Sequence, residues 1–107
     1  MTIDQHNSIV IITQEKTSIS EFSAKFSVLY ERYKDDDIII HLKDSSPEFM
    51  DSLIALSKKH RQLNHSFIVV STQLNQDNFE DDFIVVPTLQ EAYDYIEMET
   101  IERDLGI

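Results

Sequence analysis

Histidine is the residue type here most suited to metal binding or acid–base catalysis, and the chain contains four. His60 and His65 lie five positions apart, whereas helical metal-binding pairs are spaced four apart. His6 lies near the N-terminus, and His41 ends a predicted strand. His60 falls on the apolar side of a predicted helix, which is typical of a hydrogen-bonded imidazole in a core. We therefore predict no metal site.

Two runs of carboxylates, residues 35–37 and 80–82, are the next candidates for chemistry. Each run leads into the first residue of a predicted strand. Parallel α/β sheets usually bind ligands beyond the carboxyl ends of their strands, so these runs lie at the wrong end for a site. We predict that both are solvated turns that also protect the strand ends from edge pairing. An oxygen site for Mg²⁺ at either run is the alternative.

Nucleophilic and phosphate-binding motifs are missing from the sequence. The chain has no cysteine, and its one glycine, Gly106, excludes the glycine-rich loops that cradle phosphates. No Gly-x-Ser-x-Gly motif accompanies the serines. We predict that the chain is not an enzyme and needs no cofactor. The competing hypothesis is a small ligand-binding or acid–base enzyme domain that uses carboxylates or His41 at the carboxyl edge of the sheet.

The charge balance bears on the class of partner. Nine Lys and Arg residues against 20 Asp and Glu residues give a formal net charge of −11. Such a chain repels nucleic-acid phosphates and anionic lipids, and the one basic cluster is Lys58, Lys59 and Arg61. We therefore expect a protein partner with a basic or mixed surface, and neither nucleic acid nor membrane. No apolar run approaches the roughly 18–20 residues of a bilayer helix. Without cysteines or a secretory signal, the expected location is the cytoplasm.

The pattern of apolar residues predicts the elements that position these groups. Near-continuous apolar runs at 8–13, 37–42, 66–71 and 82–86 are typical of strands covered on both faces. Apolar spacings of three and four predict helices after Ser18, Ser46 and Pro87. Ser18 and Ser46 are suitable N-caps, and Pro47 suits a first helical position. An extra strand near residues 1–5 and a short helical turn within 73–80 are further possibilities.

This order, (β)βαβαβ(α)βα, predicts an α/β fold within a single domain, residues 1–107. The sheet is expected to be largely parallel, with four to five strands, right-handed crossovers and helices packed on it.

The pattern resembles the STAS domain of bacterial anti-sigma-factor antagonists over nearly the whole chain. Residues 37–42 are similar to the central strand of that family, and 49–54 match the apolar phase of the helix that follows it. Residues 64–70 resemble the next turn and strand, and 83–92 resemble the last strand and the start of the final helix. The resemblance implies a regulatory protein-interaction module that meets a partner kinase or regulator at the start of the second helix. The implied contact residues are Lys43, Asp44, Ser45, Ser46, Pro47, Glu48 and Phe49.

The chain departs from the family at its phosphorylation motif. Phospho-switched antagonists carry Asp-Ser-Ser-Gly at that helix start, but the aligned tetrad here, residues 46–49, has Pro47 at the switch serine. Asp44, Ser45 and Ser46 repeat the motif, but earlier in the chain than the aligned position. Ser45 or Ser46 could be phosphorylated at the helix N-terminus, where negative charge is favourable. Alternatively, they form a turn and an N-cap in a protein that is not phospho-switched, which is the interpretation we favour.

The C-terminal helix changes its apolar phase after Ile96. Met98, Ile101 and Leu105 form a stripe about 150–180° from the residues that face the sheet. Because one sheet cannot bury both faces, residues 97–107 are predicted to be a helical extension that docks on a second copy, a partner or a groove of this domain. A frayed tail and a purely structural homodimer are the alternatives. The tail also resembles that of short proteins called ribonuclease Z, but the histidine cluster of that nuclease is absent, so this activity is not supported.

Overall fold

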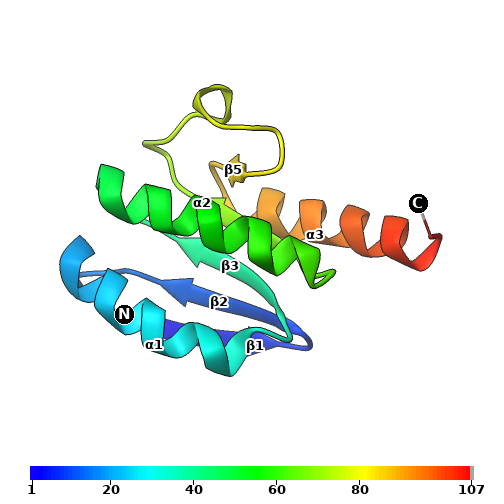
Figure 1. The fold of residues 1–107 in the computed structure, drawn as a ribbon, viewed down its shortest axis with the longest axis horizontal. Helices are drawn as coiled ribbons and strands as arrows, with labels where there is room; N and C mark the ends of the chain where they lie inside the picture. The colour runs from blue at the N-terminus through cyan, green and yellow to red at the C-terminus, as the bar shows by residue number, and fades with distance from the viewer. Residues whose placement is uncertain (107) are drawn as a thin grey trace.

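A five-stranded sheet forms the centre of the computed structural model, which describes residues 1–106 (Figure 1). The strands follow one another across the sheet in chain order, β1-β2-β3-β4-β5. β1 is antiparallel to β2, and all other neighbours are parallel. The predicted α/β class and largely parallel sheet are therefore confirmed. The strands are β1 (Thr2–His6), β2 (Ile9–Thr13), β3 (Asp37–His41), β4 (Phe67–Val70) and β5 (Ile84–Val86).

Three helices cover the two faces of this sheet. α1 (Ile19–Tyr33) and α2 (Pro47–Gln62) pack on one face, and α3 (Leu89–Asp104) packs on the other. This double cover explains the near-continuous burial of β3 and β4, because alternate residues of each strand enter the two different cores. β1 is mostly exposed and contributes Ile3 to the α1–α2 side.

Each helix begins at a side-chain N-cap, as the sequence predicts for the first two. The hydroxyl oxygens of Ser18, Ser46 and Thr88 each accept a hydrogen bond, 3.2 Å long, from the backbone N–H three residues later. Pro47 takes the first position of α2, where a backbone N–H has no helical partner. These caps fix where α1 and α2 begin, and both beginnings lie at the carboxyl edge of the parallel strands (Figure 1).

The region between β4 and β5 differs from the predicted boundaries. The strand predicted over 82–86 begins at Ile84, and the predicted helical turn is a short 3₁₀ helix, Gln76–Asn78. The Gln76 amide donates to the Phe83 carbonyl and accepts from the Val85 N–H, each at 2.7 Å. The Gln76 side chain thus satisfies backbone groups at the open edge of β5. The connecting loop covers this edge, where a further strand could otherwise pair.

Within residues 1–106, no helix has the length and apolar character needed to cross a bilayer.

Candidate functional site

The loop from β3 to α2, residues 42–46, is held by a side chain from another part of the chain. Gln14, which follows β2, is completely buried. Its Oε1 accepts hydrogen bonds from the backbone N–H groups of Lys43 (2.9 Å) and Asp44 (3.2 Å). Its Nε2 donates to the Asp44 carboxylate (2.6 Å) and to the Thr17 carbonyl (2.9 Å). One amide therefore uses both its donor and its acceptor capacity to fix this loop.

Five of the seven predicted contact residues are exposed, and the other two have structural roles. Ser46 is half-buried, and its hydroxyl caps α2. Phe49 is buried, and its ring packs edge-on against Phe22 and Phe26 at centroid distances of 5.7 and 6.5 Å. The apolar phase of α2 turns this ring into the core, so Phe49 can meet a partner only as part of the base of the groove described next. The exposed residues are Lys43, Asp44, Ser45, Pro47 and Glu48.

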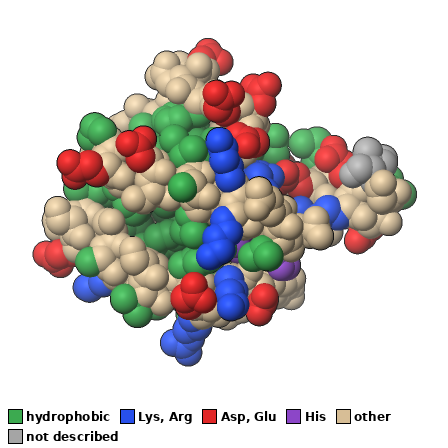
Figure 2. Space-filling view, viewed as in Figure 1, with side chains coloured by type: hydrophobic (Ala, Val, Ile, Leu, Met, Phe, Trp, Pro, Cys, Tyr) green, Lys and Arg blue, Asp and Glu red, His purple; other side chains and the backbone are tan. Residues whose placement is uncertain are grey.

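A groove between α1 and α2 begins at this loop. It consists of a cavity of about 300 Å³ beside the first turns of both helices and one of about 260 Å³ farther along, which share Ser23, Phe49 and Ser52. Figure 2 shows apolar side chains in the hollow between the two helices. The groove is apolar at its base and carries small hydroxyl side chains on both helices. Its further lining includes Ser20, Ser27, Phe26, Tyr30, Leu53 and Leu56.

The alternative hypothesis of a small enzyme places its site at the carboxyl edge of the sheet, beside His41. A cavity of about 340 Å³ there is lined by Glu15, His41 and Lys43, together with neutral residues. His41 is partly exposed at the end of β3, and no hydrogen bond or ion pair joins its side chain to another of the described residues. The cavity therefore brings together one carboxylate, one imidazole and one ammonium group without an internal arrangement that orients them for proton transfer.

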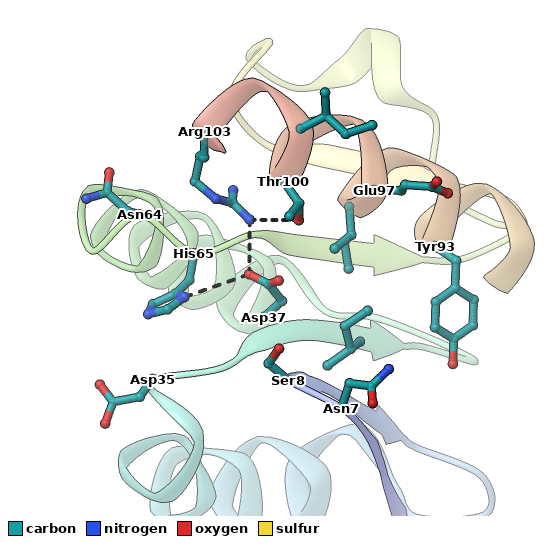
Figure 3. Close-up of a pocket in the computed structure, with 13 residues that line it drawn as sticks. Asn7, Ser8, Asp35, Asp37, Asn64, His65, Tyr93, Glu97, Thr100 and Arg103 are labelled. Carbon is teal, nitrogen blue, oxygen red and sulfur yellow. Dashed lines mark hydrogen bonds and ion pairs between the residues drawn. The ribbon is translucent and has the colours of Figure 1, made fainter. Parts of the chain in front are cut away.

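Asp37 forms a second polar cluster at the opposite, amino edge of the strands (Figure 3). Its Oδ1 accepts a 2.7 Å hydrogen bond from the Ser66 N–H and lies 3.5 Å from the Arg103 guanidinium and 3.8 Å from His65 Nδ1. Arg103 also donates to the Ser66 hydroxyl and to Thr100. Asp37 is buried, so its predicted role in a solvated turn is wrong. The carboxylate instead joins β3, the start of β4 and the end of α3.

The remaining carboxylates of the two runs have the predicted character. Asp35 is exposed and Asp36 partly exposed, and all three residues of the 80–82 run are exposed. Across residues 1–106, no group of three or more His, Asp or Glu side chains is placed to hold a metal ion.

His60 is a completely buried, hydrogen-bonded imidazole, which confirms the sequence prediction. Nε2 lies 2.7 Å from the Asp36 carbonyl oxygen, so this nitrogen carries the proton. Nδ1 then accepts a hydrogen bond from the Tyr30 hydroxyl, 2.8 Å away. Burial raises the pKa of Tyr30, which keeps this donor protonated. Burial is also the main cause that lowers the pKa of His60, with smaller effects in both directions from neighbouring groups.

The buried His60 is expected to make stability depend on pH. Its pKa is lowered in the folded state, so the unfolded chain binds the proton more readily. The free energy of unfolding should therefore fall as the pH drops below about 6.5, the ordinary histidine pKa. Urea unfolding at pH 7.5 and about pH 5.5 should show a larger loss for the wild type than for His60→Gln. Equal losses in both proteins would contradict this assignment.

The predicted apolar stripe lies on the outer side of α3. Met98, Ile101 and Leu105 are 48%, 53% and 69% exposed. α3 is one helix from Leu89 to Asp104, and the three side chains stay exposed, so the stripe does not dock in a groove of this domain. The helix also extends through most of the segment that the frayed-tail alternative describes.

Sequence reasoning did not identify Gln14 or the hydroxyl-lined groove. A single glutamine after a strand gives no pattern. The α1 serines Ser20, Ser23 and Ser27 do recur at helical spacing, but only the packing of α2 beside α1 makes their face one wall of a groove.

Comparison of the chain with protein-family models and with curated proteins finds no match.

Proposed function

We propose that the chain is a non-catalytic protein-interaction module of the STAS type. It contacts its partner through loop 42–46, the first turn of α2 and the adjoining groove between α1 and α2. The observation that carries this proposal is the buried Gln14 amide, which holds the exposed loop with three hydrogen bonds and is itself anchored by a fourth to the Thr17 carbonyl. Pre-ordering a contact loop lowers the entropy lost when a partner binds.

The groove adds the other features of a binding surface. Protein interfaces combine an apolar centre with a polar rim. Here the aromatic and leucine side chains between α1 and α2 provide the apolar base, and Ser20, Ser23 and Ser52 provide rim hydroxyls. Lys43, Asp44 and Glu48 supply charges of both signs beside it, which suits a partner with a mixed surface.

The same geometry supports a module without a phosphoserine switch. The Ser46 hydroxyl already accepts the Phe49 N–H as the N-cap of α2, and Pro47 occupies the next position. Ser45 is the exposed serine of this segment and remains the candidate for modification. The sequence resemblance to anti-sigma-factor antagonists suggests a kinase-like or regulatory protein as the partner.

Reversing the charge of Glu48 is expected to weaken partner capture. The tagged chain would be used to isolate its partner from native cytosol, with the captured protein identified by mass spectrometry. We expect Glu48→Lys to reduce capture by about tenfold or more. Repulsion between like charges, or the loss of an ion pair at the rim of the interface, costs about 1.4 kcal/mol or more of binding free energy. Glu80→Lys is the matched control, because Glu80 is an exposed glutamate in the loop before β5.

Capture that is lost in Glu48→Lys and retained in Glu80→Lys supports the proposed surface. Capture that is equal in both variants would place the interaction elsewhere on the domain. Circular dichroism of both variants checks that the fold is retained.

A further inference from the structure

Three of the five exposed large apolar side chains in residues 1–106 lie on the outer face of α3 and its C-cap. Met98, Ile101 and Leu105 recur at spacings of three and four, so they form one stripe along two helical turns. Each is about half exposed or more. Ile96 and Ala92, on the inner side of the same helix, are buried against the sheet. The stripe is therefore a second face of α3, separate from the one that the fold uses.

Side-chain contacts anchor the helix that presents this stripe. Figure 1 shows α3 running past the amino edge of the sheet. There, Glu99 Oε2 accepts a 2.6 Å hydrogen bond from the Arg61 guanidinium of α2. One turn later, Arg103 binds Asp37 and the Ser66 hydroxyl. The inner face thus changes from apolar to ionic where the sheet ends, and the outer stripe lies on an anchored helix.

The charge of α3 selects among possible occupants. The helix carries six carboxylates and one cation, and that cation, Arg103, is turned inward. Ile101 and Glu97 border a cavity of about 580 Å³ to which Asp35 adds a further negative charge. Two copies would bring like charges together, and an anionic lipid surface would be repelled. The carboxylates of α3 are Glu91, Asp94, Glu97, Glu99, Glu102 and Asp104.

We propose that the stripe of Met98, Ile101 and Leu105 binds a basic amphipathic helix of another protein. Apolar side chains of that helix at matching spacing cover the stripe, and its flanking Lys or Arg side chains meet Glu97 and Glu102. Recognition of one helix by the apolar face of another uses anchors at spacings of three, four and seven, which the stripe supplies. This surface is separate from loop 42–46, so the domain has two binding faces.

The test uses a synthetic helical peptide with Leu at positions i, i+3 and i+7 and Lys at the flanking positions. Fluorescence anisotropy measures its binding to the full chain at low and high salt. We expect salt-sensitive binding that falls about tenfold or more in the triple variant Met98→Ser, Ile101→Ser, Leu105→Ser. The control Val28→Ser should bind like the wild type, because Val28 is an exposed apolar residue of α1, on the other side of the sheet. Circular dichroism checks that the triple variant is folded.

Two results would overturn the proposal. The first is that a scrambled peptide of the same composition binds as tightly, or that the folded triple variant binds as tightly as the wild type. The second is that sedimentation of the chain alone shows a dimer that the triple variant abolishes, which would assign the stripe to a second copy.

Discussion

Replacing Gln14 with methionine is expected to lower the free energy of unfolding by about 2–4 kcal/mol and to weaken partner capture. The first effect follows from loss of partners for two backbone N–H groups, one carbonyl and one carboxylate oxygen, each of which contributes about 0.5–1.5 kcal/mol. The second follows because loop 42–46 loses its internal support. Gln14 is completely buried and cannot touch a partner, so an effect on capture reports the order of the loop.

Chemical denaturation and the capture assay would measure the two effects on the same protein. Gln73→Met is the matched control, since the Gln73 side chain is exposed and makes no hydrogen bond within the described residues. If Gln14→Met destabilises the chain but captures the partner as well as the wild type, the order of the loop is not required for binding.

Replacing Phe49 with alanine is expected to lower the free energy of unfolding by about 3–5 kcal/mol, the usual cost of removing a buried phenylalanine ring. The ring makes edge-on contacts with Phe22 and Phe26, and it also forms the base of the groove between α1 and α2. Removing it would join the groove to a new cavity in the core. Val28→Ala is the control, because Val28 is 78% exposed.

Thermal and urea unfolding would check this expectation, and a loss below about 1 kcal/mol for Phe49→Ala would contradict the packing described above. Phe49→Leu retains an apolar base and should recover much of the stability. Comparing capture by the leucine variant and the wild type then tests the groove without the large loss of stability.

The elements of the fold could be predicted because each depends on local sequence. The isoleucine- and valine-rich runs predict β2, β3 and β4, and Ser18 and Ser46 predict where α1 and α2 begin. His60 could also be assigned to the core, since its position on the apolar side of α2 is a local property.

The polar contacts that shape the candidate site could not be predicted in the same way. Asp37 looks like one of three carboxylates in a turn until β4 and α3 bring Ser66 and Arg103 to it. Gln14 gains its role only when β2 and β3 pair and place its amide beside the loop after β3. Both depend on contacts between residues far apart in the sequence, which a local pattern does not contain. The stripe on α3 could be predicted from the sequence. The negative charge around it could not, because it depends on Arg103 pointing inward in the folded structure.

Photo-cross-linking from position 45 tests the central claim most directly. A benzophenone amino acid is placed at position 45, on the exposed loop. In a control variant the benzophenone amino acid replaces Gln90, on the exposed side of α3 across the sheet. We expect the captured partner to cross-link from position 45 and not from position 90. Cross-linking from position 90 alone, or from neither position while the partner remains bound, would contradict a binding surface at loop 42–46 and the start of α2.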